Sequence, residues 1–216
     1  MSKIMFSKIR VLETGYNPAA LNMALDEAVM ENVGEVPVLR IYGWRPAAVS
    51  VGYFQSMKEE VDLEKCRQLG VDIVRRLTGG GAVLHESELT YSFITRQYPK
   101  NIMESYRWIC DAVVMSINRL GFNAIFVPLN DIIVNDKKVS GKKVSGNAQT
   151  RKKGVLLQHG TILLSVNVNR MFSVLKVPSE KLRDKIIKDV KERVSGLAGR
   201  TFDDMASSIK TSFRQI

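Results

Sequence analysis

The stretch RRLTGGGAVLH at residues 75–85 places three consecutive glycines directly after a β-strand pattern, VDIVRRL at 71–77. Glycines in a row cost backbone entropy unless the main chain needs positive φ or a close approach to a ligand. Successive backbone N–H groups in such a loop bind anions, and the paired arginines add charge-assisted hydrogen bonds. Neither a Walker A lysine nor a helix follows the glycines, so the two common nucleotide-binding motifs are excluded. An anion-binding loop is favoured, and a glycine bulge at a sheet edge is the alternative.

Helical and strand patterns alternate around this loop without a repeating βαβ rhythm. This favours an α/β (α+β) fold, with a mixed, largely antiparallel sheet flanked by helices. No linker or low-complexity stretch divides the chain, so a single domain over 1–216 is expected. Helices are predicted at 17–33, 59–69, 102–120, 169–175 and 179–193 and from 202, and strands at 36–44, 47–55, 71–77, 82–96 (two strands), 122–128, 131–136, 142–149 and 155–166.

The composition is that of an ordinary globular protein of 216 residues, with 45% hydrophobic and 25% charged residues. The N-terminus has no apolar run long enough for a signal peptide, and no segment approaches a membrane span. A cytoplasmic location is therefore expected. The net charge of +10 is uneven, because residues 137–216 carry 18 Lys and Arg against 6 Asp and Glu. The excess predicts either a basic face that attracts an anionic partner or a solvated helix of mixed charge.

Two cysteines, Cys66 and Cys110, lie in helical patterns and form no CxxC motif. Only His85 and His159 are available as further soft ligands, which argues against a zinc site. So few thiols in a chain of this length also argue against a disulfide framework.

A second group of residues with chemical potential is KKVSGNAQTRKKG at 142–154. Lys143 precedes a wall of small residues, Ser145 to Ala148, on a predicted short strand. An ammonium group in that setting suits the binding of phosphate and carboxylate together and neutralises charge that develops during acyl transfer. Taken alone, however, the stretch favours a basic hairpin with solvent-exposed lysines.

A third feature is LQHGTILL at 157–164, where His159 and Gly160 interrupt an apolar strand. A lone histidine on such a strand is more often a satisfied core residue than a catalyst. His159 is therefore expected to line a pocket and not to transfer protons.

In this order and spacing, the motifs resemble the lipoate–protein ligase family of the biotin and lipoate ligase group. The resemblance extends from about residue 8 to the end of the chain. It rests on LNMALDEAV at 21–29, VSVGYFQ at 49–55, RRLTGGGAVLH at 75–85, Asn130-Asp131 in PLNDIIV, KVSGNAQ at 143–149, QHGTILL at 158–164 and ERVSGL at 192–197.

The resemblance implies a class II synthetase-like catalytic domain that works in two steps. Lipoate and ATP give lipoyl-AMP, and the lipoyl group then passes to a lysine of a lipoyl domain, as found in dehydrogenase complex E2 subunits and the glycine cleavage H protein. Lys143 is the implied catalytic lysine; Lys138 also precedes VSG, but only Lys143 continues into GNAQ. The implied ATP and lipoyl-AMP site comprises Arg76, Gly79, Gly80, Gly81, Ala82, Val83, Leu84, Asn130, Asp131, Lys143, Gly146 and Ala148; the acyl pocket comprises His85, His159, Gly160 and Thr161; and Asp131 is the implied Mg²⁺ ligand.

Two departures from the family pattern shape the alternatives. The acyltransferase branch, which moves octanoyl groups from a carrier protein, uses a cysteine shortly before the KVSG strand, and AIFVPLNDIIVNDKK at 124–138 contains none. A thiolate mechanism is therefore poorly supported. The small C-terminal domain of single-chain ligases is also missing, which implies a separate accessory subunit. The alternatives are an octanoyl or lipoyl transferase with a thioester or amide donor, and a non-catalytic subunit that binds lipoyl-adenylate or a lipoyl domain.

Overall fold

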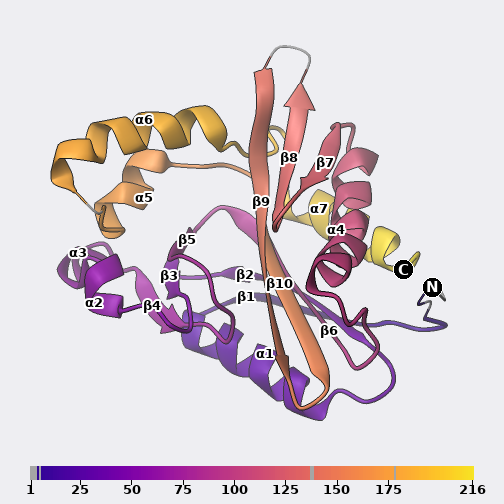
Figure 1. Cartoon of the computed structure of the whole chain (residues 1–216). Helices are drawn as coiled ribbons and strands as arrows, with labels where there is room; N and C mark the ends of the chain where they lie inside the picture. Colours follow the sequence, from indigo (N-terminus) through magenta and orange to yellow (C-terminus); the bar gives the residue numbers. More distant parts are fainter. Residues whose placement is uncertain (1–3, 5, 137–138, 178) are drawn as a thin grey trace.

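The computed structural model describes residues 4, 6–136, 139–177 and 179–216, and its centre is a seven-stranded sheet (Figure 1). Only the edge strand β1 runs parallel to its neighbour, and the other pairs are antiparallel. This confirms the predicted mixed, largely antiparallel sheet flanked by helices. The strand order is β1 (Arg10–Asn17), β2 (Val38–Trp44), β6 (Glu88–Thr95), β10 (Val155–Leu163), β9 (Val139–Lys152), β8 (Asp131–Asp136) and β7 (Ala124–Val127).

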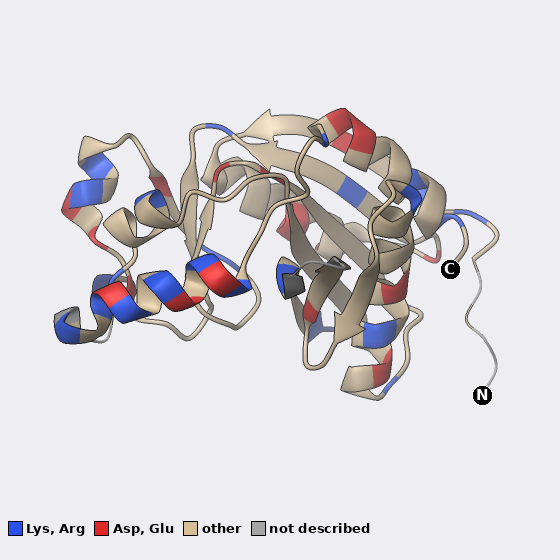
Figure 2. Ribbon diagram, turned by 90° about the horizontal axis from the view of Figure 1, so that it is seen from above, with Lys and Arg blue, Asp and Glu red and all other residues tan. Residues whose placement is uncertain are grey.

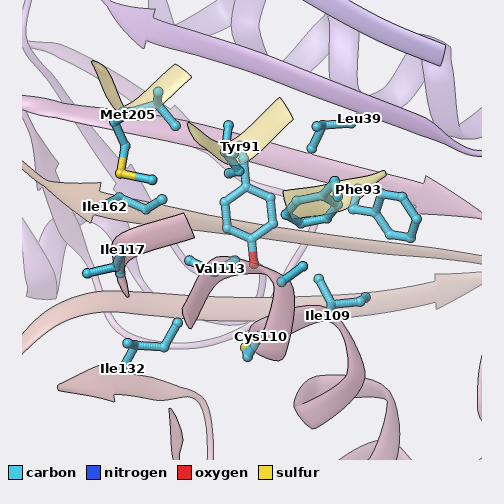
Figure 3. Close-up of a cluster of buried hydrophobic side chains, with 14 of the residues drawn as sticks. Leu39, Tyr91, Phe93, Ile109, Cys110, Val113, Ile117, Ile132, Ile162 and Met205 are labelled. Atoms are coloured by element: carbon cyan, nitrogen blue, oxygen red, sulfur yellow. The ribbon is translucent and has the colours of Figure 1, made fainter. Parts of the chain in front are cut away.

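One face of the large sheet is covered by two helices, α4 (Ile102–Arg119) and α7 (Phe202–Phe213). Alternate residues of β6 supply the sheet side of this core, because successive strand side chains point to opposite faces. Figure 3 shows Tyr91 and Phe93 of β6 packed against Ile109 and Val113 of α4. The opposite face of β6 carries more polar side chains, and these face the region that contains the cavity described below.

That opposite face is covered by α1 (Ala19–Asn32) and by a three-stranded sheet of β4 (Asp72–Arg75), β3 (Ala48–Val51) and β5 (Val83–His85). Met30 of α1 packs on Ile94 and Leu157 of the large sheet, and Met23 packs near Tyr42 and Trp44. The two sheets and α1 thus enclose a space between them.

The charged segment predicted at 179–193 is η1 (Glu180–Leu182) followed by α6 (Arg183–Arg193), next to α5 (Val168–Val174). Figure 2 shows basic and acidic residues interspersed along α6. None of the residues of α6 is buried. The helix contacts β9, and this contact brings Val190 and Val194, the residue after the helix, to the cavity described below. No described helix has the length and apolar character needed to cross a bilayer.

Two local predictions need correction. The strand β1 was not predicted, because Gly15, at φ 66°, and a register shift interrupt its pattern. The helix predicted at 59–69 is two short helices, α2 (Met57–Glu60) and α3 (Leu63–Gln68). They separate at Val61, which forms a β-bridge with Leu175, while the Asp62 side chain caps the second helix.

Candidate active site

A cavity of about 400 Å³ lies between the two sheets and brings the predicted motifs together. The glycine loop forms one wall, β9 and β10 form another, and α6 lies over it. Every site residue predicted from the sequence lines this cavity except Asp131, which contacts Lys143 from the adjacent strand. The predicted residues in the lining are Arg76, Gly79, Gly80, Gly81, Ala82, Val83, Leu84, His85, Asn130, Lys143, Gly146, Ala148, His159, Gly160 and Thr161.

Arg76 is buried and its guanidinium is bound by its own loop. It donates to the carbonyl oxygens of Gly79 at 2.8 Å, Gly81 at 2.7 Å and Ser50 at 3.0 Å. Burial lowers the pKa of Arg76 to about 10, which leaves it cationic at neutral pH. The sequence predicted an arginine that binds substrate anions, whereas the structure shows an arginine whose donors hold the glycine loop in shape.

The neighbouring segment 52–55 is held by Arg75, whose guanidinium donates to the carbonyl oxygens of Gly52, Tyr53 and Gln55 at 2.8–2.9 Å. A Cβ atom on Gly52 would lie 2.0 Å from the carbonyl oxygen of Gly80, so only glycine permits this approach. Gly80 itself has φ 95°, a conformation that favours glycine. The three glycines therefore shape one wall of the cavity, as the sequence predicted.

Lys143 reaches the cavity because of a β-bulge. Ile132 of β8 pairs with Ser145, but the next residue, Ile133, pairs with Lys143, so Val144 is an extra residue in β9. Val144 packs in the α4 core, and the bulge turns Lys143 to the face that Gly146 shares. A side chain on Gly146 would crowd the lysine, since its Cβ would lie 3.2 Å from Lys143 Nζ.

Asp131 holds the amine of Lys143 at 2.8 Å, and both side chains are about one-third exposed. The neighbouring Asn130 does not reach outward, because its amide donates to the Asn147 carbonyl oxygen at 2.6 Å and so fastens β8 to β9. Lys138, the other candidate for the active lysine, lies outside the described residues.

A row of four paired residues gives the cavity its length. Gly146 pairs with Thr161, Thr161 with Thr90, and Thr90 with Tyr42, across four neighbouring strands. All four line the cavity. Three strand spacings of roughly 4.8 Å give a path of about 14 Å from the Lys143 end to the far end. The space is therefore long enough for an extended acyl chain.

The far end of the cavity is closed by Trp44 and His85, whose rings stack with centroids 4.1 Å apart. The polar atoms around them bond to one another: Ser50 Oγ lies 2.7 Å from His85 Nε2, and Glu88 accepts at 2.5 Å from His85 Nδ1. Thr90 accepts from Trp44 Nε1 at 2.8 Å. Because these groups satisfy each other, the stacked rings can meet an apolar chain end without leaving a polar atom unpaired.

Behind His159 lies a buried charge pair, in which Arg40 Nη1 contacts Asp26 Oδ1 at 2.8 Å. His159 Nε2 lies 2.7 Å from Thr78 Oγ1, and its Nδ1 lies 3.6 Å from Asp26. Burial acts to raise the pKa of Asp26, but the His159 ring and the Arg40 guanidinium outweigh it and hold that pKa below its ordinary value. Proton transfer by His159 is not needed to explain this arrangement, which fixes the ring in the wall.

Neither cysteine of the chain takes part in the cavity. Cys66 is buried in α3 and Cys110 in α4, and neither is in the lining. Burial raises the pKa of the Cys110 thiol to about 12, and it raises that of Cys66 as well. A thiolate nucleophile is therefore not supplied by either residue. Among the described residues no group of three His, Cys, Asp or Glu side chains is placed to hold a metal ion.

Several lining residues were not predicted from the sequence. Trp44 and Ser50 line the cavity because the two sheets meet there, and no local sequence pattern reveals that meeting. Val190 and Val194 belong to the charged helical region and also line the cavity.

The fold and the cavity define a lipoate ligase-like catalytic domain. Residues 18–214 match the model of the lipoyl protein ligase A/B catalytic domain, and the chain belongs to this family. Among curated relatives, the octanoyltransferase LipM of Kyrpidia tusciae is 42% identical, over 87% of this chain and 77% of its own length. LipM of Geobacillus kaustophilus is 39% identical, over 89% and 79%. The bi-partite lipoate protein ligase of Thermoplasma acidophilum is a structural neighbour, 34% identical with a TM-score of 0.86, over 95% of this chain and 82% of its own.

These relatives confirm the predicted family and contradict the predicted reaction. The prediction of an ATP-dependent, AMP-forming lipoate ligase is wrong, because curated relatives at 37–42% identity are octanoyltransferases. The predictions of ATP and Mg²⁺ as cofactors and of lipoate as the substrate are wrong for the same reason. The reason is chemical: adenylation and thioester transfer both develop negative charge on an oxygen at the reacting centre, so one lysine and one glycine loop serve either reaction. The separate accessory subunit stays a prediction.

Proposed function

We propose that this chain transfers an octanoyl group from the thioester of an acyl carrier to a lysine of a lipoyl-domain protein. The observation that carries the proposal is the position of Lys143: it lies at one end of a cavity about 14 Å long, which suits an eight-carbon chain. The octanoyltransferase relatives support the acyl group and the reaction class. The neighbour described together with its E2 lipoyl domain supports the acceptor.

The acyl chain lies along the row from Gly146 to Tyr42, with its end at Trp44 and its carbonyl carbon beside Lys143. The acceptor lysine, as a free amine, attacks this carbon; a C–N bond forms, the C–S bond breaks, and the thiolate leaves. A proton from the attacking nitrogen ends on the departing sulfur. The Lys143 ammonium stabilises the negative oxygen that forms at the carbonyl, and Asp131 keeps the ammonium in place.

This direct transfer requires no nucleophile from the chain. The two cysteines are buried outside the cavity, so an acyl-cysteine intermediate has no residue to form on. The absence of a cysteine at the cavity argues against the mechanism in which the transferase branch forms an acyl-cysteine. Direct transfer of the acyl group to the acceptor lysine needs no such cysteine.

The test uses an unmodified lipoyl domain, the protein, and octanoyl carrier thioester without nucleotide, with intact-mass analysis of the lipoyl domain. A parallel reaction contains free octanoate or lipoate with ATP and Mg²⁺. We expect octanoylation in the first reaction. Modification that occurs only with a free acid and ATP would overturn the proposal. Lys143→Ala is expected to slow transfer by about 10²–10³. Lys142→Ala is the matched control, because the Lys142 amine lies 3.4 Å from the Lys191 carbonyl on the helix side.

A further inference from the structure

A second cavity, of about 590 Å³, borders the glycine loop and shares only one lining residue with the acyl cavity. Gly79 lines both cavities, so the two are separated at that point by a single residue without a side chain. A Cβ atom added to Gly79 would meet nothing within 4 Å, and its φ is not in the left-handed region. The main chain at Gly79 therefore leaves open space where a side chain would stand.

The second cavity has a basic end at the turn between β9 and β10, where Lys152 and Lys153 line it. Neither ammonium has an ion-pair or hydrogen-bond partner among the described residues. Arg96 and Arg151 add positive charge, although backbone carbonyls accept hydrogen bonds from both guanidinium groups. Glu27 and Glu31 of α1 also line the cavity, so an anionic group is favoured at the lysine end and not beside the helix.

An exposed aromatic pair stands at the same cavity. Phe54 is 90% exposed and Tyr53 53% exposed, with ring centroids 5.0 Å apart. The backbone that carries the pair is held firmly, since Tyr53 N donates to the Thr78 carbonyl at 2.9 Å and Arg75 donates to the carbonyls of Gly52 and Gln55. Large aromatic side chains exposed on the surface are typical of binding sites.

We infer that the second cavity binds the phosphate-bearing arm of the thioester donor, with the phosphate at Lys152 and Lys153 and the thioester passing Gly79 into the acyl cavity. The inference rests on the proposed function, which supplies a carrier thioester as donor. A cavity of this size suits a chain-like cofactor arm. The aromatic pair offers apolar contact to the arm, and the lysines offer charge to its phosphate.

The first test compares two soluble donors: octanoyl-phosphopantetheine, which has the phosphate, and octanoyl-pantetheine, which lacks it. The variant is Lys152→Gln with Lys153→Asn, where asparagine suits the φ of 52° at position 153. We expect its KM for the phosphate-bearing donor to rise about tenfold, while KM for the phosphate-free donor stays the same. The control, Lys8→Gln with Lys65→Gln, removes two exposed lysines that line neither cavity.

The outcomes separate the two proposals. An unaltered KM for the phosphate-bearing donor, or an equal rise for both donors, would overturn this inference while the proposed function stands. If neither thioester supports transfer by the unaltered chain, the proposed function has failed and this inference with it.

A second variant tests the passage. Gly79→Val is expected to fold normally and to lower kcat/KM about tenfold for both donors, because its side chain enters the open space between the cavities. Gly34→Val is the control, since a Cβ there also meets nothing within 4 Å and the site is remote. Unchanged kcat/KM in Gly79→Val would show that the donor does not pass this point.

Discussion

The Nζ atom of Lys143 lies 2.8 Å from Oδ1 of Asp131, although the two residues are on different strands and a bulge intervenes. If β9 kept Val144 as a regular residue and had no bulge, its alternation would turn Lys143 toward the α4 core. A local irregularity of the strand thus places the only charge that meets the acyl carbonyl in the proposed reaction.

Lys143→Met is predicted to lower kcat/KM for octanoyl transfer by about 10²–10³, the usual loss on removing one preorganised stabiliser of an oxyanion. Folding should be unaffected, because the side chain is about one-third exposed. Steady-state kinetics with a thermal melt measure both quantities. Lys143→Arg should recover little activity, since the guanidinium is larger and the Gly146 wall is close. Full activity in the Met variant would rule out the assigned role.

Asp131→Asn should reduce kcat about tenfold and leave KM for the donor nearly unchanged, because the carboxylate positions the lysine and does not touch the acyl chain. An isosteric amide keeps the shape of β8. Asp189→Asn is the comparison, because Asp189 lies on α6 near the same lysine but forms no ion pair with it. A rise in KM with unchanged kcat would instead place Asp131 in substrate binding.

The buried pair of Arg40 and Asp26 predicts a pH dependence of stability. The pKa of Asp26 is lower in the folded chain than in the unfolded chain, so its contribution is fully present above the unfolded value of about 3.9 and is lost as pH falls through the folded value. Chemical denaturation at pH 7 and at successively lower pH down to about 3 should therefore show a falling free energy of unfolding.

Asp26→Asn should lower the free energy of unfolding at pH 7 by about 3–5 kcal/mol, because Arg40 is left as a buried charge without its partner. The variant should also lose less stability than the unaltered chain as the pH falls below about 4. Parallel curves for the two proteins over that range would contradict the role given to Asp26.

Much of the fold was predictable because the large sheet follows plain alternation and α4 follows the helical period. The glycine loop and Lys143 were predictable as parts of one site only through the family resemblance, because the lysine-rich stretch at 142–154 alone favours a basic hairpin. The part that was not predictable depends on long-range geometry. Sequence shows that Arg76 is a cation, but not that Gly79 and Gly81 carbonyls occupy its donors. It also does not show that Trp44 and His85 meet across two sheets.

The basic helix α6 is predicted to steer an acidic acceptor domain, because Lys185, Lys188 and Lys191 are exposed on it. Transfer kcat/KM should fall as ionic strength rises from about 0.01 to 0.15 M, since screening shortens the reach of surface charge. Replacing the three lysines by Gln should remove most of that salt dependence. The matching triple variant on other surfaces, Lys8, Lys58 and Lys65 to Gln, should keep it. If kcat/KM of the unaltered chain does not change with ionic strength, α6 is a solvated helix with no part in steering the acceptor.

Trp44 is predicted to set the acyl chain length, because its ring, stacked on His85, closes the end of the cavity opposite Lys143. Trp44→Ala removes a large buried side chain and should lower stability by about 3–5 kcal/mol. It should also extend the cavity, so the ratio of dodecanoyl to octanoyl transfer should rise about tenfold even as octanoyl kcat/KM falls. Competition between the two thioesters, followed by mass analysis of the lipoyl domain, measures the ratio directly and does not depend on the amount of folded enzyme. Trp108→Ala is the control, because that tryptophan packs on the α4 side of the sheet with Phe93 and should leave the ratio unaltered. An unaltered ratio in Trp44→Ala would mean that the acyl chain ends elsewhere, and the direction assigned to the chain in the cavity would have to be reversed.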